Sequence, residues 1–199
     1  MTSKKDKQMG DIYCVKRKIG GIIKESPVLE DLIHSKNTLE WLLKLKTDAD
    51  NALKIAAWGH DIERAVEERK VRRKDYRKYD EFKDAHALNS ARILAEIMEE
   101  CEMPRDLAAD VFFLVRHHER GGTRRANLLK AADTISFFHV NLPHYFMREG
   151  EEETKRRCTW GLRKLPVNLK KAVAGFDYQN QEIAAIVKSC ADPHPTGPR

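Results

Sequence analysis

Histidine and aspartate residues recur at the ends or on the apolar faces of successive helical segments in this 199-residue chain. In chain order they are His34, His60, Asp61, His86, His117, His118 and Asp133. Imidazole and carboxylate together suit iron, manganese or zinc, and metal sites in helical bundles are built from side chains on facing helices. The pattern therefore predicts a metal centre inside a bundle.

Asp133 supplies the physical reason for expecting a metal. It stands in an apolar stretch, Leu128–Ile135, where a helix would turn its carboxylate towards the core or its rim. Burying an ionised carboxylate alone is costly, and a divalent cation compensates that cost. Taken singly, His34 reads as a hydrogen-bonded core histidine, and His117–His118 as favourable charge at a helix C-terminus. The conjunction of these histidines and aspartates in one order on successive helices favours the metal site.

The elements that must position these residues are predicted to be helices. Apolar residues recur at helical spacing over residues 27–45, 50–58, 84–101, 104–120, 126–138, 167–174 and 180–190. Ser26 is the expected N-cap of the first segment, with Pro27 at its first position, and Asp48 or Asp50 is expected to start the second. No stretch shows the sustained alternation of a strand, so the predicted fold class is all-α.

The order His34, then His60–Asp61, then Asp133 resembles the defining pattern of the HD superfamily of metal-dependent phosphohydrolases. In that family an earlier histidine, the adjacent His-Asp pair and a later aspartate bind the first metal. The resemblance covers about residues 27–138 and implies an HD-domain helical bundle. It also implies a hydroxide shared between two divalent ions, for which iron or manganese is expected, with Asp61 as the bridging carboxylate.

The second ion of bimetallic HD members is held by two further histidines, which His86 and His117 resemble. His118 would then orient the site, take a proton, or bind an additional ion together with Glu30, one turn before His34 on the same helix face. Residues 84–122 look like the HD-GYP subgroup. The Gly-Tyr-Pro signature of that subgroup is absent. The interval from His118 to Asp133 is also too short for the usual HD-GYP loop, and its length is more similar to that of bimetallic HD enzymes that split dinucleoside polyphosphates.

Arg64 stands three residues after Asp61, where many bimetallic members carry a lysine that contacts substrate phosphate. An arginine keeps the charge and offers a bidentate fork, so a phosphate-binding role is expected. The alternative is a surface salt bridge with Glu67 or Glu68. Three further cations, which could line the mouth of the site or serve as loop charges without a ligand, are Arg120, Arg124 and Arg125.

The function implied is a phosphodiesterase or pyrophosphohydrolase that cleaves a phosphate ester or anhydride, expected to be that of a nucleotide. The catalytic residues would be Asp61, Arg64 and His118. The same ligand set also resembles HD-domain mixed-valent di-iron oxygenases, and a metal-binding sensor or interaction module without turnover is a third alternative.

Composition bounds the remaining expectations. With 41% hydrophobic and 34% charged residues, the chain suits one domain, 1–199, with its core at about 27–138, a helical extension at 139–191 and a disordered tail at 192–199. Neither a membrane span nor an N-terminal apolar signal is evident, so a cytoplasmic location is expected. The four cysteines show no paired spacing, which predicts reduced thiols rather than a disulfide.

The formal net charge of +6 favours anionic ligands. The basic residues of Glu67–Lys83 are mixed with acidic ones, so this run is predicted to be solvated surface rather than a nucleic-acid site. The expected partner is a small phosphorylated substrate, with an oligomer left open.

Overall fold

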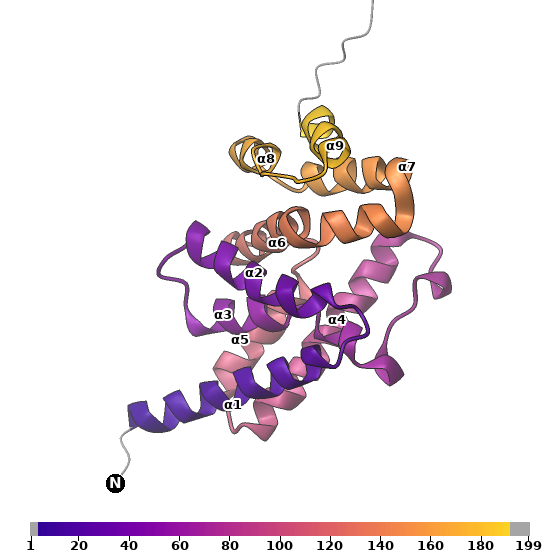
Figure 1. Ribbon diagram of the computed structural model, residues 1–199. Helices are drawn as coiled ribbons and strands as arrows, with labels where there is room; N and C mark the ends of the chain where they lie inside the picture. The colour runs from indigo at the N-terminus through magenta and orange to yellow at the C-terminus, as the bar shows by residue number, and fades with distance from the viewer. Residues whose placement is uncertain (1–3, 192–199) are drawn as a thin grey trace, which may run out of the picture. The chain divides into compact units, whose positions relative to one another are not determined.

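The computed structural model describes residues 4–191, with side chains from residue 12 onward, and these residues form helices and no strand. The all-α prediction is confirmed (Figure 1). The α-helices are α1 Lys4–Lys24, α2 Glu30–Leu45, α3 Asn51–Gly59, α4 Tyr79–Glu100, α5 Arg105–Arg116, α6 Arg124–Ser136, α7 Leu142–Arg163, α8 Val167–Ala174 and α9 Gln181–Ala191. Short 3₁₀ turns η1 Ile62–Ala65, η2 Glu67–Arg69 and η3 Arg73–Asp75 join α3 to α4, and a π-helical turn, η4 Phe137–Asn141, joins α6 to α7.

The chain divides into two compact units, Met1–Asp133 and Thr134–Arg199. The division falls inside α6, directly after Asp133, so all the predicted site residues belong to the first unit. The predicted core at about 27–138 omitted α1, which contributes Val15 and Ile19 to the buried core of that unit. The tail expected at 192–199 lies outside the described residues.

The first unit is held together by close contacts of α1, α3 and α4. Gly59, the last residue of α3, lies so near Leu94 of α4 and Ile19 of α1 that a Cβ atom there would stand 2.7 Å from a Leu94 methyl group. A larger side chain would force these helices apart, because packed interiors leave no spare volume. The tight packing therefore fixes the position of the C-terminal end of α3 against α1 and α4. His60 and Asp61 follow directly, so their positions are set by the same contacts.

Helix starts follow the predictions in part. Asp50 is the N-cap of α3, and its side chain accepts a hydrogen bond from the Leu53 backbone N–H at 2.9 Å, as expected for a capping aspartate. The predicted Ser26 cap is wrong, because α2 begins three residues later than expected, at Glu30. The Ser26 hydroxyl instead accepts from the Val28 N–H and donates to Asp31 Oδ2 at 2.6 Å.

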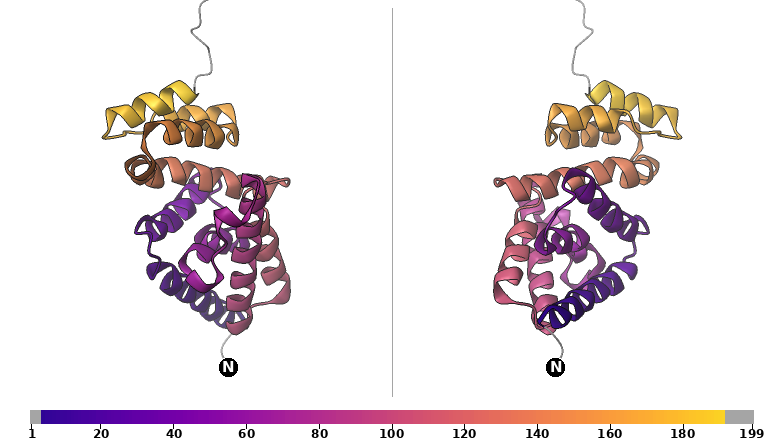
Figure 2. Two further views of the ribbon diagram at one scale, coloured as in Figure 1. Left: turned by 90° about the vertical axis from the view of Figure 1, so that its right-hand side faces the viewer. Right: turned by 90° about the vertical axis from the view of Figure 1, so that its left-hand side faces the viewer.

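Helices α4 and α5 run side by side in the first unit (Figure 2). The chain turns between them at Cys101, and Cys101 forms a disulfide with Cys14 of α1. The prediction of reduced thiols is therefore wrong for this pair, because the fold brings together two cysteines that are 87 residues apart. Sequence spacing carried no signal for such a distant pairing. Cys158 and Cys190 are free.

The second unit contains α7, α8 and α9, and α7 packs along α9. Helix α7 lies within the predicted helical extension at 139–191, although its own bounds were not predicted. Gly150 interrupts it with a φ of 78°, a left-handed conformation that glycine adopts without steric cost. None of the described helices is long and apolar enough to cross a membrane.

Candidate metal centre

Two groups of histidine and carboxylate side chains meet in the interior of the first unit. The first group consists of His34 from α2, His60 after α3, and Asp133 from α6. The second consists of Asp61, His86 from α4, and His118 after α5. Within each group the donor atoms lie within 4.8 Å of one another, so each group could close around one ion.

Three atoms converge in the first group. His34 Nε2 lies 3.2 Å from His60 Nε2, and Asp133 Oδ1 lies 3.2 Å from the former and 3.4 Å from the latter. His34 and His60 are 3% and 0% exposed. Two bare lone pairs cannot face each other at this distance in a buried site, so either one of the two nitrogens carries a proton and donates it, or both face a metal ion.

Asp61 stands between the two groups and offers a carboxylate oxygen to each. Its Oδ1 lies 2.8 Å from His86 Nε2 and 3.7 Å from both His60 Nε2 and His118 Nε2. Its Oδ2 lies 3.9 Å from His34 Nε2. Asp61 therefore has the position expected of a carboxylate that bridges two ions.

Two of the imidazoles have their tautomer set by an outward hydrogen bond from Nδ1 to a backbone carbonyl. His60 Nδ1 lies 3.1 Å from the Ala57 carbonyl oxygen, and His118 Nδ1 lies 2.7 Å from that of Val115. A carbonyl oxygen only accepts, so each Nδ1 must carry the proton. Both carbonyls belong to the last turn of a helix, where carbonyl groups have no i+4 N–H within the helix to accept from. Each helix end thus orients its own histidine with Nε2 towards the centre, the arrangement typical of metal-ligating imidazoles.

His118 shows most clearly that an ion fits here. Its Nε2 is buried and has no hydrogen-bond partner among the described residues, although Asp61 and Glu119 carboxylate oxygens lie 3.7 Å and 3.5 Å away. Burial opposes protonation of this imidazole, but those two carboxylates outweigh it and raise the pKa of His118 to about 10. The surroundings therefore demand positive charge at this nitrogen.

The charge balance of the whole centre points the same way. Burial raises the pKa of Asp61 and of Asp133, yet the neighbouring histidines lower both pKa values well below the usual range. Fixed cations in contact with this cluster include Arg64 and Lys83. The carboxylates are Glu30, Asp31, Asp61, Glu63, Glu119 and Asp133. Buried carboxylates in this number need positive charge beside them, which protonated histidines or bound metal ions can supply.

His117 was predicted as a ligand of the second ion, but the structure puts His118 there. The His117 imidazole packs against Phe113 instead, with ring centroids 4.5 Å apart. A sequence signal for the choice existed: residue 118 continues the buried face of α5 that carries Leu114 and Val115, four and three residues earlier. His117 continues the face of Phe113, which is 41% exposed.

Arg64 lies against the carboxylate of Asp61. Its Nη1 donates to Asp61 Oδ2 at 3.2 Å and its Nη2 contacts Asp31 Oδ1 at 3.0 Å. Asp31, which sequence analysis did not single out, is 5% exposed, and its burial raises its pKa despite the nearby guanidinium. The Arg64 side chain keeps 32% exposure, so it remains reachable from solvent. The alternative salt bridge with Glu67 or Glu68 is not formed.

The three cations expected at the mouth of the site are placed differently. Arg125 clamps Asp50 and Asp110 with paired contacts of 2.9 Å and 2.7 Å, and so joins the starts of α3 and α6 to α5. Arg120 contacts Asp84, and Arg124 is exposed. Carboxylates therefore already engage Arg120 and Arg125, which makes Arg125 a structural residue.

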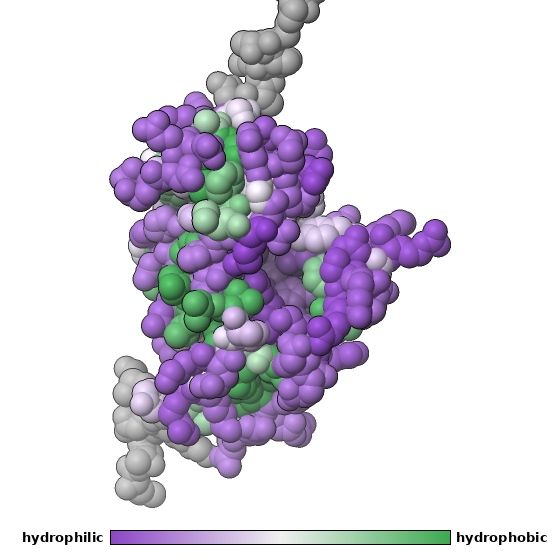
Figure 3. All heavy atoms as spheres, turned by 45° about the vertical axis from the view of Figure 1, so that its right-hand side comes forward, coloured by the Kyte–Doolittle hydropathy of each residue, from purple (hydrophilic) through white to green (hydrophobic). Residues whose placement is uncertain are grey.

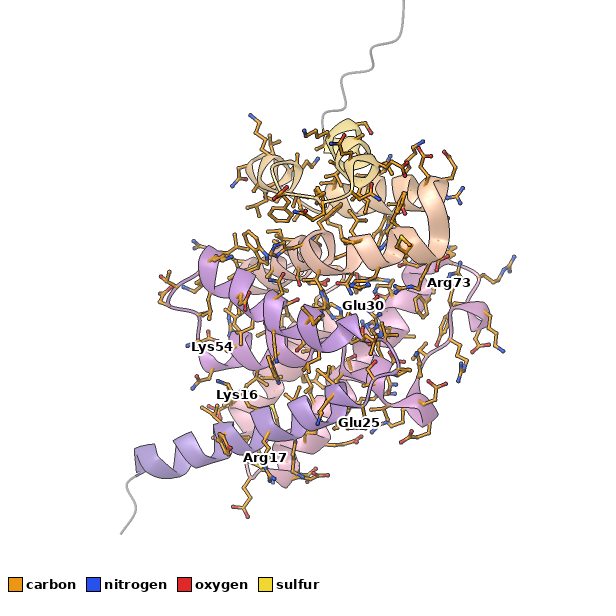
Figure 4. All side chains as sticks on the ribbon, in the orientation of Figure 1. Lys16, Arg17, Glu25, Glu30, Lys54 and Arg73 are labelled. Carbon is orange, nitrogen blue, oxygen red and sulfur yellow. A yellow bond between two sulfur atoms is a disulfide. The ribbon has the colours of Figure 1, made fainter. Side chains whose placement is uncertain are left out.

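Glu30 was considered as a ligand of an additional ion. It begins α2, is 4% exposed and raises the pKa of Arg64 through its charge (labelled in Figure 4). Among the described residues it belongs to none of the groups that could hold an ion. A third such group instead joins His118 and Asp133 with Glu119, which links the two ligand sets to each other.

Two contacts around the ligands were missed by sequence analysis. Glu63 is 1% exposed and accepts a hydrogen bond from His86 Nδ1 at 2.5 Å. Lys83, one turn before His86 on α4, forms an ion pair with Glu119 next to His118. Neither residue had a motif to reveal it, because both act through partners far away in the sequence.

Comparison with known proteins assigns the chain to a family. Residues 20–187 match a family described as a domain of unknown function, DUF4202. The chain belongs to that family. The match spans α2 to α6, so it includes every residue of both ligand groups. No curated protein and no solved structure matches the chain.

Proposed function

We propose that this DUF4202 protein is a dinuclear metal-dependent phosphohydrolase that cleaves a phosphate ester or anhydride of a nucleotide. The observation that carries the proposal is the position of Asp61. One of its oxygens faces His86 and His118, and the other faces His34 and Arg64. A bridging carboxylate with histidines on both sides and a guanidinium beside it suits the hydrolysis of an anionic substrate.

The donor set fits divalent ions that accept both nitrogen and oxygen ligands, among which iron and manganese are proposed. His34, His60, Asp61 and Asp133 would hold one ion, and Asp61, His86 and His118 the other. When bound, such ions supply a water nucleophile near neutral pH and polarise phosphoryl oxygens. His118 is assigned here as a ligand rather than a proton shuttle.

The protein's own contribution begins with Arg64. Its guanidinium is fixed by Asp31 and Asp61, and the rest of its fork can donate to a phosphoryl oxygen at the edge of the centre. Such a donor offsets the negative charge that develops on a phosphate during cleavage. Asp31, in turn held by the Ser26 hydroxyl, keeps the guanidinium in place before substrate binds.

This function can be tested by assaying metal-loaded protein against a panel of phosphate substrates. Purified protein would be loaded with Mn²⁺, or with Fe²⁺ under anaerobic conditions, and assayed with bis(p-nitrophenyl) phosphate, linear nucleotides, dinucleoside polyphosphates and cyclic di-GMP. We expect phosphate ester or anhydride cleavage that Asp61→Asn abolishes, with linear nucleotides hydrolysed faster than cyclic di-GMP. Substrate-dependent consumption of dioxygen without hydrolysis would favour the di-iron oxygenase alternative instead.

A further inference from the structure

One face of helix α4 leads from solvent to the metal centre. Tyr79, Phe82, Lys83 and His86 are spaced by three and four residues, so their side chains share this face. Exposure falls along it, from 36% at Tyr79 through 15% for the Lys83 side chain to 3% at His86. The face is therefore a graded path that ends on a ligand of the second group.

Aromatic rings are continuous along this path. The Phe82 ring lies 6.4 Å from the His86 ring with an interplanar angle of 29°, a stacked arrangement. Tyr79 and Tyr76 in turn lie 5.9 Å and 6.2 Å from Phe82. Arg73 lies over the Tyr79 ring, 5.8 Å from its centroid. Aromatic and guanidinium planes at this spacing are surfaces on which nucleic-acid bases stack.

The segment that leads into this helix carries most of the chain's excess charge. Residues 69–83, which we name the basic arm, contain eight lysines and arginines and three acidic residues, a net charge of +5 out of the chain's formal +6. Figure 3 shows a mostly hydrophilic projection where Figure 1 places this arm, and Arg73 on it is labelled in Figure 4. The rest of the sequence is close to neutral, so a polyanion is attracted here above all.

Ion pairing leaves the outer part of the arm available. Three contacts fix its base. Arg69 forms an ion pair with Glu96, the Asn89 side chain donates a hydrogen bond to the Arg69 carbonyl oxygen, and the Val71 N–H donates to the Glu63 carboxylate. Arg72 and Lys70 pair with Glu67. The exposed acids Asp75, Asp80 and Glu81 share the outer arm. Nevertheless, no carboxylate of the described residues forms an ion pair with Lys74, Arg77 or Lys78, and all three are exposed.

We propose that the basic arm and this face of α4 bind single-stranded nucleic acid and lead its end to the metal centre. The inference rests on the proposed function and narrows its substrate class from nucleotides to oligonucleotides. A mononucleotide needs only the ligands and Arg64, whereas alternating cations and rings match a chain of alternating phosphates and bases. The sequence alone predicts solvated surface for Glu67–Lys83, because the helix face shared by these side chains and its gradient of burial become evident only in the structure.

Binding can be measured separately from cleavage. Fluorescence anisotropy with labelled ten-nucleotide poly(A) RNA and oligo(dT) would compare the wild-type protein with the triple variant Lys74→Glu, Arg77→Glu, Lys78→Glu. A matched control replaces two lysines and one arginine that are also exposed in the first unit, on α1: Lys16→Glu, Arg17→Glu, Lys24→Glu. A denaturing gel after each titration shows whether the oligonucleotide remained intact.

We expect the arm variant to lose at least about tenfold in affinity and the control variant less than about threefold, with wild-type binding weakened by salt. Tyr79→Ala should lose about fivefold or more, and Tyr79→Phe should retain binding, because stacking requires only the ring. Equal losses in the arm and control variants would overturn the inference. Binding of inorganic polyphosphate of equal charge as tightly as the oligonucleotide would overturn it as well.

The two proposals fail separately. Tight binding that depends on the arm, without any cleavage by the metal-loaded protein, would support the inference and count against the proposed function. Cleavage of mononucleotides without detectable oligonucleotide binding would support the proposed function and refute the inference.

Discussion

The carboxylate of Glu63 accepts a hydrogen bond from His86 Nδ1 at 2.5 Å, while His86 Nε2 lies 2.8 Å from Asp61. Glu63 is 1% exposed and also accepts from the Val71 backbone N–H. A carboxylate behind a ligating imidazole fixes the tautomer and raises the basicity of the nitrogen opposite. Glu63 is therefore a positioning residue for the second ion that we propose, and it also holds the base of the basic arm.

Glu63→Gln should weaken the second ion selectively. The amide keeps the size of the side chain but loses the negative charge that fixes the His86 tautomer, so affinity for the second ion should fall by about 10- to 100-fold. Mn²⁺ titration combined with elemental analysis after dialysis would measure the loss, with one ion retained. Glu68→Gln, an exposed change in the neighbouring turn, serves as the control. Two ions retained at wild-type affinity would contradict the assignment.

The choice between the adjacent histidines can be tested directly. His118→Ala should remove the second ion, because its Nε2 belongs to the second ligand group. His117→Ala should leave two ions bound, because that ring packs against Phe113. Asp61→Ala should lose both ions. Elemental analysis of the three variants, beside a wild-type sample expected to hold two ions per chain, decides the matter. Loss of an ion in His117→Ala alone would restore the sequence-based assignment.

Replacing Arg64 should affect catalysis and substrate binding, whereas replacing Arg125 should affect only the stability of the fold. Arg64→Ala should raise KM and lower kcat for phosphate substrates with little change in metal content, and Arg64→Lys should be milder because it keeps the charge. Arg125→Ala should leave KM unchanged and lower stability by no more than about 1 kcal/mol, since its pairs with Asp50 and Asp110 are partly exposed. Steady-state kinetics and denaturant unfolding measure the two effects. An unchanged KM in Arg64→Ala would remove Arg64 from the substrate site.

The Cys14–Cys101 disulfide should contribute measurably to stability. It joins α1 to the end of α4 and closes a long loop, so it restricts the unfolded chain. Replacing both cysteines by serine should lower the free energy of unfolding by about 2–4 kcal/mol under non-reducing conditions. Urea unfolding with and without reductant measures this, and the wild-type protein in reductant should resemble the variant. Alkylation of both cysteines in the native, non-reduced protein would show that the bond does not form.

Local sequence pattern predicted most of the helices and most of the residues in the two clustered groups of histidine and carboxylate side chains. Periodic apolar residues located α3, and residue type and position narrowed its start to Asp48 or Asp50, of which the structure has Asp50 as the N-cap. Helix α1 was missed because lysines and other polar residues obscure its stripe of Val15, Ile19 and Ile23. Glu63 and the disulfide partners could not be predicted, since each contact joins segments far apart in the chain.

The metal-free protein should lose stability as the pH rises above neutrality. The pKa of His118 is raised from 6.5 to about 10, and that of His60 is raised as well. A group that binds its proton more tightly when folded stabilises the protein fully below its unfolded pKa, and this contribution disappears as the pH rises through the folded value. The affected window is therefore about pH 6.5 to 10. Asp61 and Asp133, whose pKa values are lowered, stabilise the fold above about pH 4 and lose that contribution only in acid.

Thermal unfolding in the presence of a chelator should thus show Tm falling between pH 7 and pH 10, and His118→Gln should fall less steeply. Saturating Mn²⁺ should remove this fall, because the ion replaces the protons, and its binding strengthens as they dissociate. Scans of both forms across this range, with His117→Gln as the matched control, provide the measurement. A metal-free Tm that stays level from pH 7 to 10 would mean that the carboxylates around His118 do not hold a proton there, and the electrostatic case for an ion at that nitrogen would fail.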